Sequence, residues 1–171
     1  MAEVPTVRVL TAEDAPAYRE VRLAALRGDP LAFLTTAEEF AVRTMESIAG
    51  RMAPGETSVT FGAFLNGTLV GLLTVAREDR PRLAHRANVF GVSVAPAARG
   101  QGCGDALLRA GLAQVREWPG VTSVHLAVTE TQHAARRLYE RHGFTVWGTQ
   151  PDALRDDGGQ VHAEHHLSLT L

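Results

Sequence analysis

The sequence predicts a mixed α/β fold, and three features of the chain support this prediction. Two β-rich runs flank Asn66-Gly67, the strongest short-range signal for an antiparallel hairpin. A β-rich run ending at Val94 is followed by a glycine-rich turn and, from Gly102, by helical periodicity. The last run, 161–171, alternates apolar and polar residues, as expected of a strand with one buried face. The expected architecture is a twisted mixed sheet with helices on both faces.

The N-terminal third is expected to contain one short strand, residues 7–10, and two helices. The first helix begins at Thr11 and ends at about Arg27, because Gly28-Asp29-Pro30 breaks it. The second begins at Thr36, since the sequence Thr-Ala-Glu-Glu fits a capping box. Apolar residues then recur at helical spacing and are expected to face the core: Ala41, Met45, Ile48 and Met52.

The remaining elements bring the total to about seven strands and four helices. The hairpin consists of residues 57–65 and 68–76. Gly143 is suited to a left-handed cap at the end of the last helix. The other expected elements are strands 87–94, 123–128, 145–150 and 161–171 and helices 102–118 and 131–142. Because no linker, repeat or low-complexity tract interrupts them, the chain is expected to form a single domain, 1–171.

Composition narrows the class of protein. With 45% hydrophobic and 21% charged residues, the 171-residue chain has the composition of a soluble globular protein. A net charge of -2 argues against a nucleic-acid partner, and no apolar run is long enough to span a membrane. The single cysteine cannot form an internal disulfide. No secretory signal is visible at the N-terminus, and a cytoplasmic location is expected.

The segment Arg99-Gly100-Gln101-Gly102-Cys103-Gly104-Asp105 is the most informative part of the chain. Glycines after a strand and before a helix let backbone N–H groups and the helix dipole face an anion. The spacing does not fit a dinucleotide fingerprint, and all 17 basic residues are arginines, so the lysine of a P-loop is missing. The anion is therefore expected to belong to another phosphorylated cofactor.

Two motifs in this order resemble the GNAT superfamily of acetyl-CoA-dependent N-acetyltransferases. The first is Arg99-x-x-Gly102-x-Gly104, and the second is Gln132-x-x-Ala135-x-x-Leu138-Tyr139-x-x-x-Gly143-Phe144. The resemblance covers roughly residues 88–147 and implies a GNAT-like fold. It further implies an acyltransferase that moves acetyl from acetyl-CoA to a primary amine by direct nucleophilic attack, with no metal.

The resemblance also implies roles for individual residues. Tyr139 is the expected catalytic residue, because a phenol is protonated at neutral pH and can donate a proton to the departing thiolate. A half-buried structural tyrosine beside Leu138 is the alternative. The main chain of the fourth strand is expected to polarise the thioester and hold the pantetheine arm. The residues expected to bind the cofactor are Val92, Ser93, Val94, Arg99, Gly100, Gln101, Gly102, Cys103, Gly104, Asp105 and Gln132.

The general base is not identified by the sequence. The family's glutamate on the fifth strand is replaced by Ala127. His125 lies on the same strand face, and Glu78, Asp79 and His85 flank the neighbouring strand, but each is more readily explained as a surface or core residue. A water relay, or an amine of low pKa, would make a base unnecessary.

Three other patterns are explained better by structure than by chemistry. Cys103 is expected to pack as a small apolar residue. Histidines and a glutamate that alternate along the last strand are too widely spaced to ligate one zinc ion. A basic stretch before the fourth strand suggests a phosphate or nucleic-acid contact but fits a solvated hairpin arm better. The residues of the last strand are His162, Glu164 and His166. The basic stretch contains Arg77, Arg80, Arg82 and Arg86.

The acceptor is expected opposite the cofactor, between segments 28–36 and 151–160. These segments contain four aspartates, Asp29, Asp152, Asp156 and Asp157. They could favour a cationic acceptor, although solvated turns commonly contain aspartate. A small-molecule or peptide amine is the expected partner, and a homodimer is left open. Two other functions are alternatives: a non-catalytic acyl-CoA-binding sensor or regulatory module, which the missing glutamate favours, and a nucleotide-binding α/β protein, which the glycine spacing disfavours.

Overall fold

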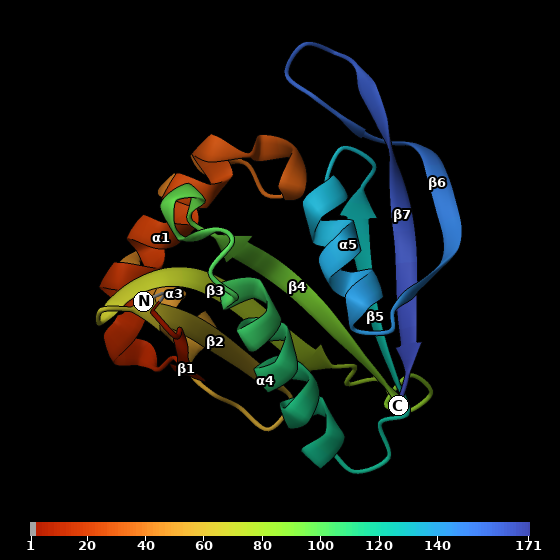
Figure 1. Cartoon of the computed structure of the whole chain (residues 1–171), viewed down its shortest axis with the longest axis horizontal. Helices are drawn as coiled ribbons and strands as arrows, with labels where there is room; N and C mark the ends of the chain where they lie inside the picture. The colour runs from red at the N-terminus through yellow and green to blue at the C-terminus, as the bar shows by residue number, and fades with distance from the viewer. Residues whose placement is uncertain (1–2) are drawn as a thin grey trace.

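The computed structural model describes residues 3–171, and its central feature is a seven-stranded sheet (Figure 1). The strand order is β1-β2-β3-β4-β5-β7-β6. All neighbouring strands are antiparallel except β4 and β5, which are parallel. The strands are β1 (Thr6–Val9), β2 (Ser58–Leu65), β3 (Thr68–Arg77), β4 (Arg86–Val94), β5 (Ser123–Thr129), β6 (Thr145–Arg155) and β7 (Val161–Thr170).

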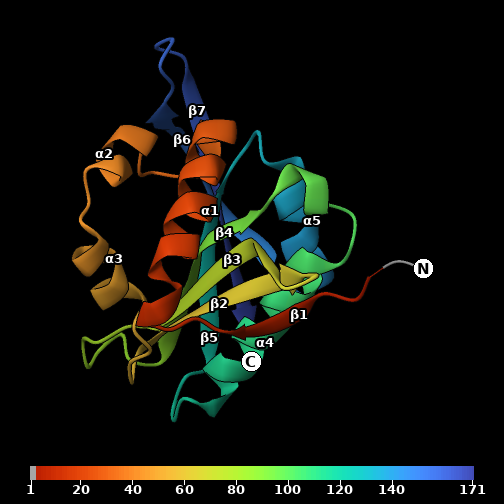
Figure 2. The same ribbon diagram turned by 90° about the vertical axis from the view of Figure 1, so that its left-hand side faces the viewer.

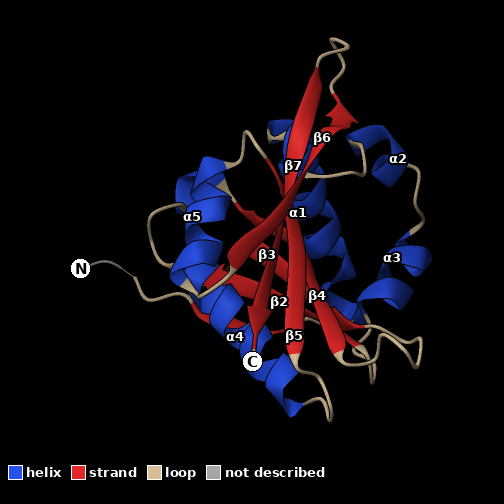
Figure 3. Cartoon of the chain, turned by 90° about the vertical axis from the view of Figure 1, so that its right-hand side faces the viewer, coloured by secondary structure: helices blue, strands red, loops and turns tan. Residues whose placement is uncertain are grey.

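Helices cover both faces of this sheet, as expected (Figure 2). Helices α1, α2 and α3 lie on one face, and α4 and α5 lie on the other, which Figure 3 shows from the opposite side. The five α-helices within residues 3–171 are α1 (Ala15–Gly28), α2 (Ala37–Ala41), α3 (Met45–Met52), α4 (Cys103–Glu117) and α5 (His133–Arg141). No helix in the described part of the chain is long and apolar enough to cross a membrane.

Each face of the sheet has its own apolar core. The core beneath α4 and α5 includes Leu108, Leu112 and Val115 of α4. The core beneath α1–α3 includes Leu23 and Leu26 of α1. The two cores fix α1 and α4 on opposite sides of the sheet (Figure 2).

Local signals in the sequence were accurate where they involved turns. Asn66 and Gly67 both have positive φ, 48° and 74°, as the two-residue hairpin between β2 and β3 requires. Gly143 has a φ of 92° and follows the end of α5. Thr36 caps α2 with the predicted box, because its hydroxyl accepts a hydrogen bond from the Glu39 amide at 3.1 Å.

Two predictions about elements were wrong. The helix expected from Thr36 to Met52 is two helices, because Thr44 forms a second N-cap and accepts a hydrogen bond from the Ser47 amide. Met45 is consequently 43% exposed, although Ile48 and Met52 are buried. The total is therefore five α-helices within residues 3–171, not four.

The second error concerns the closing hairpin. Strand β6 continues past Gln150 to Arg155, through a bulge at which Asp152 has a φ of 50°. On β7, His162 was expected on the solvent face but is 7% exposed. Its Nε2 lies 2.9 Å from the Asp156 carboxylate, and this pairing makes its burial tolerable.

Candidate functional site

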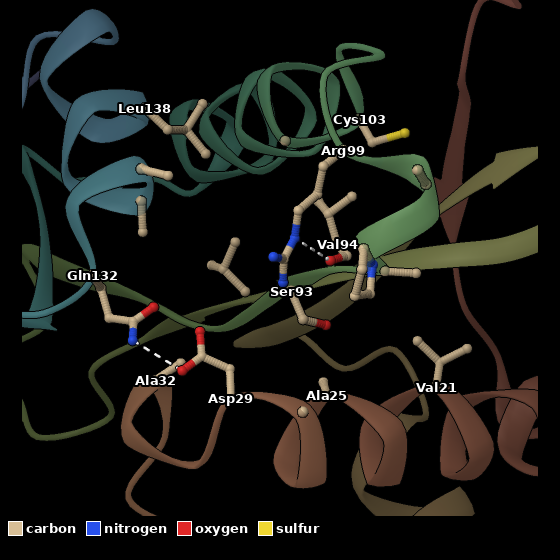
Figure 4. Close-up of a pocket in the computed structure, with 18 of the residues that line it drawn as sticks. Val21, Ala25, Asp29, Ala32, Ser93, Val94, Arg99, Cys103, Gln132 and Leu138 are labelled. Atoms are coloured by element: carbon tan, nitrogen blue, oxygen red, sulfur yellow. Dashed lines mark hydrogen bonds between the residues drawn. The ribbon is translucent and has the colours of Figure 1, made fainter.

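The main cavity has a volume of about 720 Å³ and lies where the two layers of helices meet the ends of β4 (Figure 4). Its walls come from α1 and the loop after it, the last residues of β4, the turn that opens α4, and one side of α5 from Ala134 to Arg141. This volume lies within the range of small-molecule and cofactor sites, which is about 300–1,000 Å³.

The turn that opens α4 presents main-chain donors to this cavity. Gly100 and Gly102 have φ values of 75° and 82°, a conformation that glycine adopts without strain. No side chain caps Gly102, and the first internal bond of the helix runs from the Ala106 amide to the Gly102 carbonyl. Within residues 3–171, no amide from 100 to 105 donates to another group of the protein. These amides are therefore available to an anion.

Two features hold this turn against α5. A Cβ on Gly104 would lie 3.1 Å from Cδ2 of Leu138, so glycine permits the close approach of the two helices. The carboxylate of Asp105 accepts hydrogen bonds from Arg141 at 3.1 Å and from His142 at 2.9 Å. Burial opposes ionisation of Asp105, but these partners outweigh it and lower the pKa of the carboxyl group. The Asp105 carboxylate is thus occupied, and its amide is the group left for a ligand.

The side chains of Arg99, Gln101 and Cys103, which were also predicted to bind the cofactor, point in three different directions. Arg99 extends into the cavity, where its Nε donates to the Val94 carbonyl at 3.3 Å (Figure 4). Gln101 instead folds back, and its side-chain amide donates to the Ala97 carbonyl. Cys103 is 1% exposed and packs in the core, and burial raises the pKa of its thiol. The structure therefore favours the apolar packing role for Cys103.

Strands β4 and β5 diverge as they approach the cavity. Their pairing extends from Arg86 opposite Ser123 to Asn88 opposite His125, and beyond that point they separate (Figure 1). The far end of β4 therefore has a free edge on the β5 side, where an extended molecule could lie between the strands.

The main chain of β4 has a bulge at this edge. Phe90 faces Thr74 and Ser93 faces Leu72, so Gly91 and Val92 together occupy the place opposite one residue of β3. Further on, the Ala95 amide donates to β3, and by alternation the groups of Ser93 also face β3 while those of Val94 face the gap. The Val94 carbonyl receives Arg99 from that side.

Ser93, which is predicted to bind the cofactor through its main chain, lines the cavity with its side chain. Its main chain pairs with β3, whereas its side chain lines the cavity on the side of α1 (Figure 4). The Oγ atom is buried and has no hydrogen-bond partner within residues 3–171. Gln132, across the cavity, donates from Nε2 to the carboxylate of Asp29 at 3.0 Å.

Tyr139 does not line the main cavity, although its sequence neighbour Leu138 does. It is 6% exposed, and its ring meets the ring of Phe144 edge-on at 6.1 Å. Burial raises the pKa of its phenol, so the hydroxyl stays protonated throughout the physiological range.

The candidate bases lie away from the turn. His125 lines a second cavity of about 210 Å³ together with Asn88 and Trp147, and its Nε2 lies 2.9 Å from Ser123 Oγ. Burial, with a smaller contribution from nearby cationic groups, lowers the pKa of His125. Glu78 accepts a hydrogen bond from Asn88. Asp79 and His85 are exposed near the beginning of β4, at the opposite end of the strand from Gly100.

The predicted boundaries of the acceptor site are only partly matched. The loop after α1 lines the cavity through Asp29, Ala32 and Phe33, and it is anchored to β5 because Thr129 donates to the Leu31 carbonyl at 2.7 Å. Segment 151–160 does not line the main cavity; it forms the outer end of the β6–β7 hairpin. No sequence pattern indicates Phe33, because an aromatic residue in a loop has no distinctive spacing.

The arginine stretch before β4 belongs to a different part of the molecule. Arg77 donates to the Ala84 carbonyl across the β3–β4 connection, and Arg80 and Arg82 are exposed there. These side chains lie at the end of β4 opposite the cavity, as a solvated hairpin arm requires. Over residues 3–171, no group of three or more His, Cys, Asp or Glu side chains could hold a metal ion.

Comparison with known proteins agrees with this geometry. The profile of the acetyltransferase (GNAT) family matches residues 23–144. A mycothiol acetyltransferase of Salinispora tropica is 42% identical over 81 residues, which are 47% of this chain and 26% of that protein. The L-amino acid N-acetyltransferase of Escherichia coli is 32% identical over 101 residues, 59% of this chain and 62% of that protein.

A solved GCN5-related N-acetyltransferase from Kribbella flavida superimposes with a TM-score of 0.78 and 30% identity, over 98% of both chains. The chain spans about a quarter of the length of the mycothiol acetyltransferase that it matches. The seven-stranded mixed sheet, the diverging β4 and β5 and the family profile lead to one conclusion: the chain belongs to the GNAT family of acetyltransferases.

Proposed function

We propose that this protein transfers an acetyl group from acetyl-CoA to a primary amine by direct nucleophilic attack. The observation that carries the proposal is the row of uncommitted amides from Gly100 to Asp105 beside the free edge of β4. Each hydrogen bond to a charged group contributes about 1.5–3 kcal/mol. Several such bonds to a diphosphate account for tight binding of coenzyme A.

The rest of the cofactor follows the gap between β4 and β5. Main-chain groups of Val94 and of the bulge residue Val92 hold the pantetheine arm, and an amide of this segment donates to the thioester oxygen as it gains negative charge. Arg99 leaves the Val94 carbonyl and pairs with a phosphate, for which its planar fork of donors is suited.

Acetyl transfer then needs one bond to form and one to break. The neutral amine attacks the thioester carbon, the C–S bond breaks, and Tyr139 supplies the proton that the departing thiolate takes up. Burial raises the pKa of Tyr139, so its phenol carries this proton at neutral pH. The amine nitrogen loses its surplus proton to water, and a proton from water restores the Tyr139 phenol, so no side chain is required as the base.

The names of the relatives support a small amine as the acceptor, because one is named for mycothiol and another for L-amino acids. The cavity between α1 and α5 is the place where such a molecule would meet the cofactor.

Titration with coenzyme A and a turnover assay test the proposal together. At about 100 times its dissociation constant, coenzyme A is expected to stabilise the fold by about 2.7 kcal/mol. The Arg99→Ala variant should weaken binding by about 10-fold, since one charged hydrogen bond is lost. The matched control is Arg109→Ala, an exposed arginine of α4 outside the cavity, which should bind normally.

Turnover is followed by thiol release from acetyl-CoA with a panel of amines. Release of thiol that requires an amine is the expected result. Binding of coenzyme A with no amine-dependent release would contradict the catalytic proposal and favour a non-catalytic acyl-CoA-binding module. Failure of coenzyme A to bind would contradict both.

A further inference from the structure

Asp29 is a carboxylate of the main cavity to which the proposed chemistry gives no role. It directly follows α1, and its side chain extends into the cavity (Figure 4). One carboxylate oxygen accepts a hydrogen bond from Nε2 of Gln132 at 3.0 Å, and the other has no partner within residues 3–171. No ion pair in this part of the chain includes Asp29. The cavity wall therefore carries a negative charge that no cation within residues 3–171 neutralises.

The position of Asp29 at the end of α1 makes this charge unfavourable in the absence of a ligand. Asp29 follows the last helical residue, Gly28, and its amide donates to the Ala25 carbonyl at 3.0 Å. The C-terminal end of a helix carries a partial negative charge, which disfavours a carboxylate and favours a cation there. A cation bound at this place would be attracted by the carboxylate and by the helix end together.

A ligand can reach the carboxylate because the neighbouring residues are small. Ala25, Gly28 and Ala32 line the cavity beside Asp29, and both alanines are labelled in Figure 4. A Cβ on Gly28 would have no atom within 4 Å, so the space next to it is open. The Asp29 side chain itself is only partly buried.

Two hydrogen bonds fix Asp29 beside the expected path of the cofactor. Thr129, at the end of β5, donates to the Leu31 carbonyl at 2.7 Å and so holds the loop after α1 against β5. Gln132, which binds the Asp29 carboxylate, is one of the residues expected to contact the pantetheine arm. Asp29 is therefore separated from the expected place of that arm by a single side chain.

The strand register relates this position to the thioester. The last pair of β4 and β5 is Asn88 opposite His125. Val92 on β4 and Thr129 on β5 each lie four residues further along, so they stand at about the same level on the two sides of the gap. Val92 belongs to the segment assigned to the thioester. Asp29, held near Thr129, approaches that level from the β5 side.

We propose that Asp29 binds the attacking nitrogen of the acceptor, and that the acceptor is an amine without a carboxylate beside it. This inference rests on the proposed acetyl transfer. The free carboxylate oxygen accepts a hydrogen bond from the amine N–H. As the N–C bond forms, the nitrogen becomes positively charged, and the carboxylate stabilises that charge until the proton passes to water. An acceptor carboxylate next to the amine would be repelled by Asp29.

The first test replaces Asp29 by asparagine, which keeps an oxygen for Gln132 but removes the charge. With saturating acetyl-CoA, kcat/KM for the most active amine of the panel is expected to fall about 10- to 100-fold, the effect of losing one charged hydrogen bond. The affinity for coenzyme A should not change, which distinguishes loss of acceptor binding from loss of structure. Asp29→Glu, which restores the charge on a longer side chain, should recover part of the activity.

Glu20→Gln is the matched control for charge. Glu20 is an exposed acid of the same cavity wall, nine residues earlier on α1 and thus roughly 13 Å away along the helix. Because an exposed charge at that distance acts weakly, its loss should lower kcat/KM by less than about 5-fold. An equal loss in both variants, or an unchanged kcat/KM in Asp29→Asn, would overturn the assignment.

The class of acceptor is tested with L-amino acids and their carboxamides, which keep the amine and the side chain but lack the negative charge. In the pairs that are acetylated, wild-type kcat/KM should be about 5-fold or more higher for the carboxamide. Asp29→Asn should narrow this difference, which separates repulsion by Asp29 from the weaker basicity of the carboxamide's amine. A preference for the free acids, or a difference that does not narrow, would contradict the proposed class.

A binding measurement separates failure of this inference from failure of the proposed chemistry. The amines of the panel are titrated into the protein saturated with coenzyme A, which has no acetyl group to transfer. Binding of an amine that weakens at least about 10-fold in Asp29→Asn supports the site even if no amine is acetylated. Absence of such binding, or equal binding to both proteins, contradicts the site even if acetyl transfer is observed.

Discussion

Replacing Tyr139 by phenylalanine removes one oxygen and leaves the packing of the ring. The edge-on contact with Phe144 at 6.1 Å and the buried position are available to phenylalanine, so the free energy of unfolding should change by less than about 1 kcal/mol. The rate should change far more. A positioned acid contributes about 10²–10⁴-fold, which is about 2.7–5.5 kcal/mol of activation free energy. The expected result is a kcat lowered by at least about 10²-fold.

The assay is steady-state thiol release with acetyl-CoA in excess, accompanied by titration with coenzyme A. Tyr18→Phe is the matched control, because Tyr18 meets Phe40 edge-on at 6.3 Å and lies outside the cavity. Its kcat should stay at the wild-type value. Because burial raises the pKa of Tyr139, wild-type kcat should not fall between pH 7 and about 10 through loss of this proton. A kcat for Tyr139→Phe within a few-fold of wild type, or an equal loss of cofactor affinity, would refute the role as an acid.

Two further predictions concern stability. Gly111→Ala should destabilise the fold by roughly 1–2 kcal/mol in chemical denaturation, because the new Cβ would lie 2.7 Å from Cδ2 of Leu73; Gly50→Ala, with open space around it, should instead stabilise by about 0.5–1 kcal/mol. The hydrogen bond from Arg8 lowers the pKa of Asp14 to about 2, so its stabilisation is present above about pH 4 and is lost as the pH falls through 2. Wild type should therefore lose more stability than Asp14→Asn across this range, and equal losses would contradict the assignment.

The sequence predicted most accurately what depends on a few neighbouring residues. The Asn66-Gly67 hairpin, the cap at Thr36 and the glycine turn after Pro96 are local, because backbone conformation and short-range hydrogen bonds decide them. The split at Thr44 was also local, yet it was missed because apolar spacing continued across it. Three residues after Thr44 stands Ser47 rather than the glutamate or glutamine of a capping box. The cap is therefore a weaker signal than the apolar periodicity.

The parts of the site that sequence reasoning missed depend on tertiary contacts. Phe33 lines the cavity because the loop after α1 is anchored to β5 through Thr129, and no periodicity encodes that contact. The free edge of β4 arises from divergence of two strands about 35 residues apart in the chain. The different fates of Ser93 and Val94 follow from the bulge at Gly91, which strand propensity alone does not reveal.

The brief pairing of β4 with β5 has a consequence for motion. The sheet is joined across its middle by a short parallel ladder, so the half that carries β6 and β7 should tilt more easily than either half deforms. A pantetheine chain lying in the gap would restrain the tilt of one half of the sheet relative to the other. Amide hydrogen exchange in residues 126–129 of β5 should then slow when coenzyme A is added, and the cosubstrate would complete the sheet mechanically as well as supply the acetyl group.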